Sequence, residues 1–463
     1  MSRSDAISLA YLVTIVTFIL ALRFLSSPKR ARLGNWLGAA GMTIAIAATF
    51  AREGVENDLS IVVVMAASAP AGVYAARAVK MTAMPQMVAL FNGVGGGAAA
   101  LIALAEFHDH APEPGRLSAN AALSIILSSL IGSVSFAGSM VAFGKLQELV
   151  GGRPIVYPGQ KVGNAALLAT LVAVAVAILA GPQSTVLLIA LIAGALLFGV
   201  LFVLPIGGAD MPVVIALLNA FTGLAASATG FVLHENVLIV SGMLVGASGT
   251  LLTLLMARAM GRSIGNVLFG AFGQLQVTAE ALAAGDGHVR SASAEDVAVM
   301  LAYAQRVIIV PGYGMAVAQA QHDVRKLADE LARRGVEVRY AIHPVAGRMP
   351  GHMNVLLAEA NVPYDQLFEM DQINADFPET DVALVIGAND VTNPAARNQP
   401  GSPIYGMPIL DVDRAKNVVV IKRSMNPGFA GIDNPLYRDP RTVMLFADAK
   451  AGVSELVEDV KAL

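Results

Sequence analysis

Two glycines, Gly312 and Gly314, are spaced as in a loop that binds a phosphate. They follow the apolar run 306–310, which predicts a buried strand, and they open a segment that predicts a helix. There one glycine can make the turn, and the other lets backbone N–H groups approach a pyrophosphate at a helix N-terminus. Val317 replaces the third glycine of the usual fingerprint, but the context favours a nucleotide site over a structural turn. The residues assigned to this turn are Gly312, Tyr313, Gly314, Met315, Ala316 and Val317.

A basic triplet, Lys422-Arg423-Ser424, follows another short apolar run at 418–421. Two cations and a hydroxyl at the carboxyl edge of a sheet suit a phosphate. The run 336–342 ends in His343, without the carboxylate that holds the ribose 2′-hydroxyl of NAD. These observations favour NADP(H) over NAD(H). The alternative is that Lys422 and Arg423 are a solvated surface pair.

Three further segments, 346–354, 387–390 and 425–434, are rich in Gly, Pro and Asn. Ordinary turns have the same composition, but at a sheet edge such segments are candidates for a pyrophosphate cradle and a closing lid. Asp390 suits either a helix cap or a ligand to the ribose or nicotinamide. The residues assigned to the cofactor here are Ala346, Gly347, Arg348, Met349, Pro350, Gly387, Ala388, Asn389, Asp390, Gly428, Phe429, Ala430 and Gly431.

The sequence lacks the residues that several kinds of chemistry require. The chain has no cysteine, which excludes disulfides, Cys-ligated zinc, iron–sulfur clusters and thiol catalysis. No Ser-Tyr-Lys set or His-Asp relay stands beside the glycine turn, so we expect no acid or base acting on a hydride and no metal site. A hydride partner must then come from another polypeptide. The net charge of −3 argues against a nucleic-acid partner.

The elements that must position these residues form two unlike halves. Hydrophobic residues make up 56% of the chain and charged residues 14%, with the long apolar runs all before residue 262. Stretches of about 20 apolar residues cross the bilayer as helices. Nine are predicted, near 7–25, 36–51, 59–76, 86–105, 119–143, 164–181, 185–205, 212–233 and 237–257. A lipid bilayer is therefore an expected partner.

Charged residues in the connections predict the orientation of these spans. Basic residues cluster in alternate connections, at 23–32, 77–80, 145–161 and 258–262, whereas acidic residues lie in others, at 53–58, 106–113 and 235. The positive-inside rule then places the N-terminus outside and residues 258–463 in the cytoplasm.

The middles of the spans contain no Lys, Arg, Asp, Glu or His, the residues that usually mark a proton or ion relay. They contain glycines, a serine series that includes Ser133, and the amides Asn92 and Asn219. Close helix packing with interhelical hydrogen bonds is the simpler interpretation. A buried amide costs free energy unless it is satisfied, so Asn92 and Asn219 should bond another helix or a file of water.

The second half reads as a Rossmann-like α/β domain. Short apolar strands at 306–310, 336–342, 382–386, 418–421 and 443–446 alternate with helical segments, one of them running from 311 to about 334. This alternation predicts a doubly wound parallel sheet. The predicted divisions are a membrane domain at 1–262, a linker at 263–293 and a nucleotide domain at 294–463.

Long motifs in both halves resemble one known family. They lie at 86–97, 143–147, 204–212 and 219–223 in the membrane half, and at 311–321, 346–360, 385–395 and 422–426 in the soluble half. Together they resemble the beta subunit of the proton-translocating NAD(P) transhydrogenase over essentially the whole chain. A nucleotide-gated ion channel or transporter is the alternative, but no selectivity motif or charged pore ring supports it.

The resemblance implies a specific mechanism. NADP(H) would bind in a reversed orientation under a lid at 425–434, with Lys422, Arg423 and Ser424 on its 2′-phosphate. A partner alpha subunit with further membrane helices would hold NAD(H) and exchange hydride directly, coupled to proton movement in a bacterial inner membrane. A dimer of such protomers is expected.

The resemblance also implies roles for single residues. Asp371 would couple NADP(H) binding to protonation. Asp210 and Asn219 match positions tied to the proton path, on which Asn92 and Ser133 are also placed. Two departures are visible: Asn92 stands where many relatives have histidine, and Phe429 stands where the lid often has tyrosine. The titrating group therefore need not be in this chain.

Overall fold

The computed structural model divides into two compact units. They comprise Met1–Pro205 with Val214–Thr253, and Ile206–Val213 with Leu254–Leu463. The structure describes residues 3–25, 30–52, 58–79, 83–110, 117–147, 149–151, 155–181, 184–207, 210–260, 264–265, 288–348, 351–400, 402, 404–428 and 430–463. Most of the predicted linker at 263–293 lies outside these residues.

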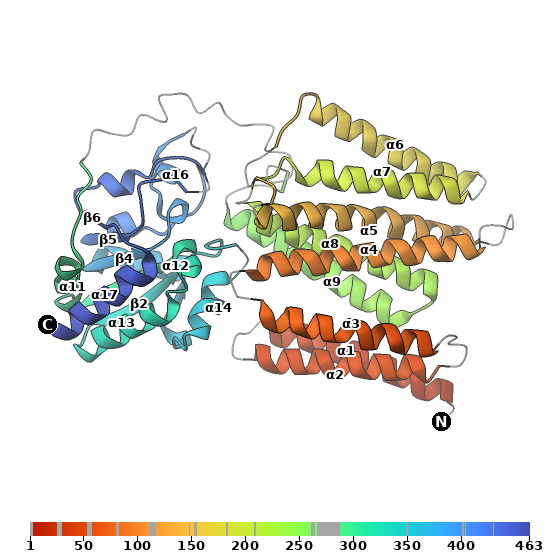
Figure 1. Ribbon diagram of the computed structural model, residues 1–463, viewed down its shortest axis with the longest axis horizontal. Coiled ribbons are helices and arrows are strands. Elements are labelled where there is room, and N and C mark those ends of the chain that lie inside the picture. The colour runs from red at the N-terminus through yellow and green to blue at the C-terminus, as the bar shows by residue number, and fades with distance from the viewer. Residues whose placement is uncertain are drawn as a thin grey trace. The chain divides into compact units, whose positions relative to one another are not determined.

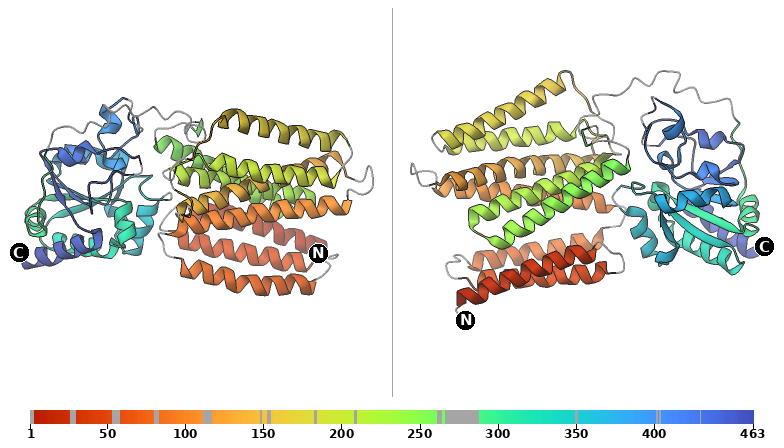
Figure 2. Two further views of the ribbon diagram at one scale, coloured as in Figure 1. Left: turned by 45° about the horizontal axis from the view of Figure 1, so that its top comes forward. Right: turned by 180° about the vertical axis from the view of Figure 1, so that it is seen from behind.

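Long apolar helices dominate the first unit (Figures 1 and 2). In the described part of the chain, nine helices are long and apolar enough to cross a membrane. They are α1 (Arg3–Leu25), α2 (Ala31–Phe50), α3 (Asp58–Ala78), α4 (Met84–His110), α5 (Ala119–Leu146), α6 (Gln160–Ala180), α7 (Thr185–Val203), α8 (Met211–Leu233) and α9 (Asn236–Ala259). Each coincides within a few residues with a predicted stretch, so the predicted multi-pass membrane protein is confirmed.

Small residues let these helices pack closely. A Cβ added to Gly96 of α4 would lie 2.8 Å from the carbonyl oxygen of Gly132 in α5, and one added to Gly223 of α8 would lie 2.6 Å from the backbone nitrogen of Gly246 in α9. Such backbone contacts supply the van der Waals packing that holds helices together in lipid, where no hydrophobic force acts between them.

The second unit is built on a six-stranded parallel sheet of order β3-β2-β1-β4-β5-β6. Its strands are β1 (Arg306–Pro311), β2 (Glu337–Ile342), β3 (Leu367–Glu369), β4 (Val382–Ile386), β5 (Asn417–Ile421) and β6 (Thr442–Leu445). The order reverses between β1 and β4, which is the switch point of a doubly wound sheet. The predicted α/β fold is confirmed.

Helices and short turns cover the two faces of this sheet (Figure 1). The helices α11 (Ala294–Ala302), α13 (Gln321–Arg333) and α17 (Ala449–Ala462) pack together in one layer. Side chains of alternate strand residues, such as Ile308 and Val310, pack on the other face against α15 (Met370–Ile373) and neighbouring turns. All five residues of β4 are buried, as expected for a central strand covered on both faces.

Two sequence predictions differ from the structure. The helix expected from 311 to about 334 is two helices, α12 (Tyr313–Ala318) and α13, because Gln319 adopts a left-handed conformation with φ of 53° and ends α12. The strand β3 was not predicted, so the sheet has six strands where the sequence indicated five. Residues 290–292, assigned to the linker, also bond to Met444 of β6.

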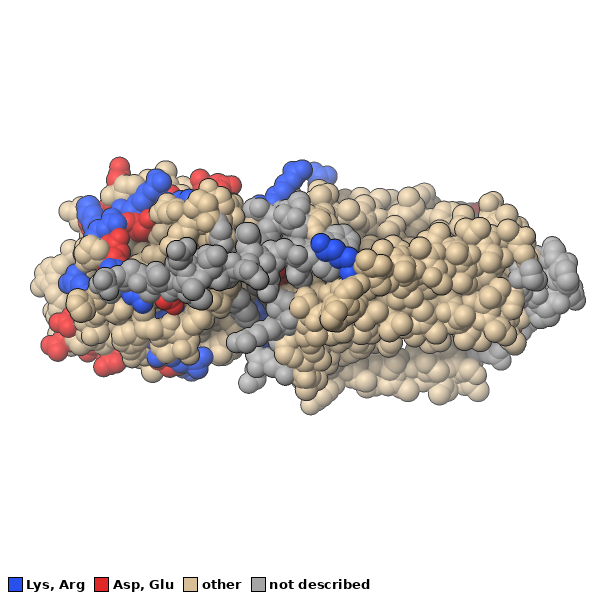
Figure 3. Space-filling model, turned by 90° about the horizontal axis from the view of Figure 1, so that it is seen from above, with Lys and Arg blue, Asp and Glu red and all other residues tan. Residues whose placement is uncertain are grey.

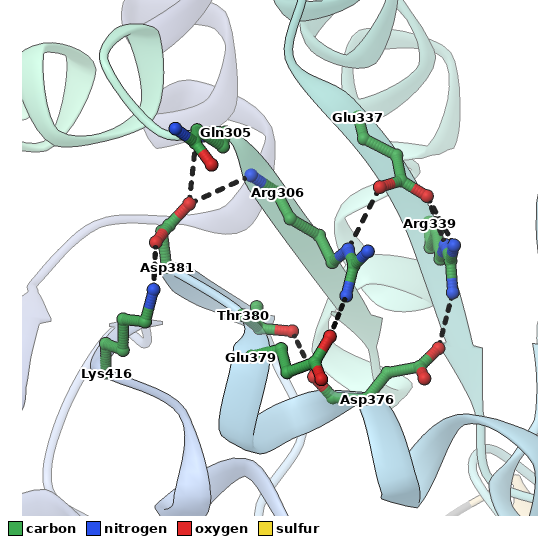
Figure 4. A network of polar contacts seen from close by, with 9 residues as sticks. All are labelled: Gln305, Arg306, Glu337, Arg339, Asp376, Glu379, Thr380, Asp381 and Lys416. Atoms are coloured by element: carbon green, nitrogen blue, oxygen red, sulfur yellow. Dashed lines mark hydrogen bonds and ion pairs between the residues drawn. The ribbon is translucent and has the colours of Figure 1, made fainter.

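Charged side chains gather on the second unit, whereas the surface of the helical unit is almost free of them in the view of Figure 3. At the amino ends of the strands they form a connected network (Figure 4). Arg306 bonds Glu337 at 2.9 Å and Glu379 at 3.2 Å. The carboxylate of Asp381 accepts the N–H groups of Gln305 and Arg306 at 2.8 and 3.0 Å and pairs with Lys416 at 2.8 Å. These bonds tie β1, β2, β4 and β5 together, away from the predicted cofactor edge.

Candidate functional site

The predicted cofactor residues all follow the carboxyl ends of strands in the second unit. The glycine turn follows β1, residues 346–348 follow β2, 387–390 follow β4 and 422–424 follow β5. Because parallel strands end at one edge of the sheet, the structure brings these segments to the same side of the domain. Met349, Pro350 and Phe429 lie outside the described residues.

The glycine turn is held against the turn that follows β4. Gly312 donates its N–H to the carbonyl of Ile386 at 2.9 Å, and Gly314 donates to that of Gly387, also at 2.9 Å. A Cβ added to Gly314 would lie 2.7 Å from the Cα of Gly387. The glycines therefore let two backbones meet, and their own N–H groups are already bonded. A pyrophosphate at this turn would have to be met by other donors.

Several other residues assigned to the cofactor have buried side chains, so only their backbone atoms could contact a ligand. Met315 and Ala316 are fully buried in the core, and Ala346 and Ala388 are 5% and 4% exposed. Val317, by contrast, is 47% exposed. The sequence pattern located the turn correctly in the chain, but burial removes most of these side chains from contact with a ligand.

Arg348 is fixed by two aromatic neighbours. Its guanidinium carbon lies 4.5 Å from the ring centroid of Tyr313, a cation–π geometry. Its backbone N–H donates to Nδ1 of His352 at 3.0 Å. His352 is buried, and burial together with the charge of Arg348 lowers its pKa to about 4. Nδ1 accepts a bond, so the neutral ring carries its proton on Nε2. No feature of the sequence distinguishes His352, although it lies within the segment 346–354.

His343 and Asp371 follow the neighbouring strands β2 and β3. The ring of His343 bonds the carbonyl of Pro408 at 2.9 Å. Burial lowers the pKa of His343 to about 4, opposed by that bond and by the negative charge of Asp371. Asp371 is exposed and lies in the first turn of α15, immediately after β3. Neither β3 nor this short helix was predicted from the sequence.

The segment 425–434, the predicted lid, lies against the turn that follows β4. Ala430 donates its N–H to Asp390 at 3.0 Å, and Asn434 donates to the carbonyl of Asn389 at 3.2 Å. A Cβ added to Gly428 would lie 2.6 Å from a carboxylate oxygen of Asp390. Asp390 begins the 3₁₀ turn η6 (Asp390–Thr392) and also bonds this segment. Gly431 is exposed and has φ of 71°.

The basic triplet after β5 contains one partly buried cation and one exposed cation. Lys422 is half-buried, its ammonium bonds the carbonyl of Asn426, and burial lowers its pKa while Asp390 and Asp433 oppose that shift. Arg423 is exposed, and the hydroxyl of Ser424 accepts the N–H of Asn426 at 3.4 Å. One cation is therefore fixed and the next reaches solvent, with a hydroxyl beside them. That arrangement suits a phosphate approaching the carboxyl end of β5.

The membrane amide Asn92 joins three helices. Its Nδ2 donates to the hydroxyl of Ser139 in α5 at 3.1 Å, and its backbone carbonyl accepts the hydroxyl of Thr222 in α8 at 3.2 Å. Asn219 of α8 is partly buried. Asp210 belongs to the second unit and immediately precedes α8.

Hydroxyl pairs between α5 and α8 support helix packing. Ser135 bonds Thr222 at 2.6 Å, and two helical turns away Ser128 bonds Thr229 at 2.7 Å. The hydroxyl of Ser133 and the Oδ1 of Asn92, in contrast, are buried without a partner in the described part of the chain. These two atoms are among the buried polar atoms of the helices that would need water as a partner.

No group of three or more residues suited to a metal ion occurs among the described residues.

Among known families, a model described as NAD(P) transhydrogenase beta subunit matches residues 7–459. Two curated relatives, each named NAD(P) transhydrogenase subunit beta and both from Rhodospirillum rubrum, are 50% identical over 456 residues. The alignments cover 97% of this chain and 98% of the relatives.

Proposed function

This chain belongs to the NAD(P) transhydrogenase beta subunits, and from that premise we propose that its second unit binds NADP(H) at the carboxyl edge of the sheet. The observation that carries the proposal is the basic triplet after β5. Lys422 is held half-buried beside Asn389 and the segment 425–434, with Arg423 and Ser424 next to it. A fixed ammonium, a solvent-exposed guanidinium and a hydroxyl together fit the 2′-phosphate of NADP(H).

The absence of a carboxylate after β2 supports the same cofactor. β2 ends at Ile342, and the next side chain is the buried, neutral His343. The end of β2 therefore lacks the Asp or Glu that holds the ribose 2′-hydroxyl in an NAD site. Residues 425–434 would act as the lid, and the cofactor would lie in the reversed orientation that the family resemblance implies.

In the proposed reaction the bound nicotinamide supplies the hydride chemistry, exchanging hydride with NAD(H) on a partner alpha subunit. This chain binds and orients NADP(H) and excludes water, and none of its residues needs to act as an acid or base on the hydride. The alpha subunit would also bring further membrane helices, in a dimer of protomers. We place the complex in a bacterial inner membrane with the N-terminus outside.

Hydride exchange would be coupled to proton movement through the membrane helices. The unpartnered polar atoms of Asn92 and Ser133 support a water-mediated path there, and we assign Asn219 and Asp210 to it as well. Asp371 would link cofactor state to protonation. The proposed divisions are 1–262 for the membrane domain, 263–293 for the linker and 294–463 for the cofactor domain.

The cofactor assignment is tested by replacing both cations in the full chain. Lys422→Ala with Arg423→Ala should weaken NADPH on the order of 100-fold and NADH only a few-fold, because each charge-assisted hydrogen bond contributes about 1.5–3 kcal/mol. Equilibrium binding of both nucleotides in detergent measures this. Lys450→Ala with Lys461→Ala on α17 is the matched control and should change neither affinity. Equal losses of NADPH and NADH would disprove the assignment.

A further inference from the structure

Tyr437 is a buried residue that the proposed function does not use. It lies in the 3₁₀ turn η8 (Pro435–Arg438) and is 2% exposed. Its ring packs in the core cluster that includes Val420 of β5 and Met444 of β6. A tyrosine placed only to fill this space would need no particular partner for its ring face.

The ring face does have a partner, the ammonium of Lys422. The two are separated by 4.9 Å from nitrogen to ring centroid, within the range of a cation–π interaction. The lysine side chain has several rotatable bonds, and here its end is held by the ring and by the carbonyl of Asn426. A ligand that bonds this ammonium therefore has less of the side chain left to order.

The hydroxyl of Tyr437 reaches the segment 425–434 through one intermediate, Asn389. Tyr437 and the Asn389 amide are 2.8 Å apart. With the amide turned so that both of its ends are satisfied, its nitrogen donates to the tyrosine oxygen, and its oxygen accepts the N–H of Gly428 at 2.6 Å and Lys422 at 3.3 Å. The ring thus contacts the ammonium of Lys422 directly, whereas the hydroxyl reaches Gly428 and Lys422 only through Asn389.

We propose that Tyr437 is a positioning residue that sets the preference for a 2′-phosphorylated nucleotide, by fixing the ammonium of Lys422 against its ring. Its hydroxyl has a second task, which is to hold Gly428 through Asn389 and so support the lid over either nucleotide. The inference rests on the proposed function, in which Lys422 bonds the 2′-phosphate. It adds the residue that keeps Lys422 in place.

Ring and hydroxyl are separable by substitution in the full chain, with NADPH and NADH affinities measured by nicotinamide fluorescence in detergent. Tyr437→Phe keeps the ring, so both nucleotides should weaken by a similar few-fold and their affinity ratio should stay within twofold. Tyr437→Leu removes the ring face and should lower the NADPH-to-NADH ratio about tenfold, as expected for a partly desolvated cation–π pair. In a Lys422→Ala background, Tyr437→Leu should not change the ratio further.

Tyr340, a fully buried tyrosine of β2, supplies the matched control. Tyr340→Leu should lower stability without altering the affinity ratio. Because Tyr437→Leu can also prevent folding, a second series replaces Tyr437 with phenylalanine and its mono- and trifluorinated forms. These keep the shape of the ring while weakening its negative face, so the ratio should fall stepwise with fluorination.

Two results would overturn the inference alone: a ratio that does not change across the fluorinated series, or a Tyr437→Leu protein that loses NADPH and NADH equally while Lys422→Ala still discriminates between them. A Lys422→Ala protein with the wild-type ratio would instead disprove the 2′-phosphate assignment on which the inference rests.

Discussion

At the scale of single residues, the negative charge of Asp371 acts on the buried imidazole of His343. The charge of Asp371 raises the pKa of His343, which burial holds near 4. If Asp371 couples cofactor state to protonation, Asp371→Asn should flatten the dependence of NADPH affinity on pH, because the charge that responds to the cofactor is gone. Measured affinities from pH 5 to pH 8 test this. An unchanged profile would rule the role out.

His343→Gln is the companion variant, because glutamine can still donate to Pro408 but does not titrate. The folded-state pKa of His343 lies below its ordinary value of 6.5, so the unfolded chain binds the extra proton. The stability that this residue contributes is therefore fully present above pH 6.5 and is lost as the pH falls toward 4. His343→Gln should remove that loss. If it also flattens the affinity profile, the histidine and not Asp371 carries the proton.

Which site residues the sequence could reveal depended on how far apart their partners lie. Lys422, Arg423 and Ser424 are adjacent, and residue type alone indicates a phosphate. Tyr437 and Asn389 are 48 residues apart, and no local sequence pattern predicts their contact. His352 was missed for a different reason: its partner Arg348 is only four residues away, but the burial that distinguishes it from an ordinary surface histidine cannot be read from the sequence.

At the scale of elements, periodicity recovered the long spans and the central strands but not the short pieces. The strand β3 has three residues, Leu367–Glu369, too few to show alternation. The break after α12 depends on one left-handed residue, Gln319, and glutamine carries no signal for that conformation. Both omissions bear on the site, because Asp371 follows β3 directly and α12 follows the glycine turn.

Asp381 is the residue that joins the amino ends of β1, β4 and β5 (Figure 4). The bond to Lys416 and two backbone N–H groups hold its pKa below the ordinary 3.8. The stability that Asp381 contributes is thus fully present above pH 3.8 and is lost as the pH falls through the lowered pKa. Asp381→Asn should cost about 1–3 kcal/mol at neutral pH and speed amide hydrogen exchange at the starts of β1 and β4, measured on the full chain by mass spectrometry.

Glu379→Gln serves as its control, because that carboxylate belongs to the same network but its side chain is 79% exposed. An exposed ion pair contributes little, so this variant should exchange like the wild type. Equal acceleration in both variants would mean that general loss of negative charge, and not the bonds of Asp381, explains the effect.

At the scale of the whole molecule, the chain joins an α/β domain to a bundle of long apolar helices that have no Lys, Arg, Asp, Glu or His at their middles. Much of the polarity that remains is used for packing, as in the pairs Ser135 with Thr222 and Ser128 with Thr229. Neither amides nor hydroxyls can hold a transferable proton at neutral pH. If the bundle takes part in the proposed proton movement, it can orient water or a carrier, and the carrier itself must then come from another subunit.

The last prediction follows from that requirement. The chain alone in vesicles should move no protons on NADPH addition, and pumping should appear when a partner supplies membrane helices with one titrating residue. In that complex Asn92→Leu should reduce pumping more than hydride exchange between the soluble domains, because it removes the bond to Ser139 and the Oδ1 that water would satisfy. Ser128→Ala, which removes only a packing hydroxyl, is the control and should leave the ratio of pumping to exchange unchanged. Proton pumping by the chain alone would contradict the requirement for a carrier from another subunit. Full pumping in the Asn92→Leu complex would assign Asn92 to helix packing.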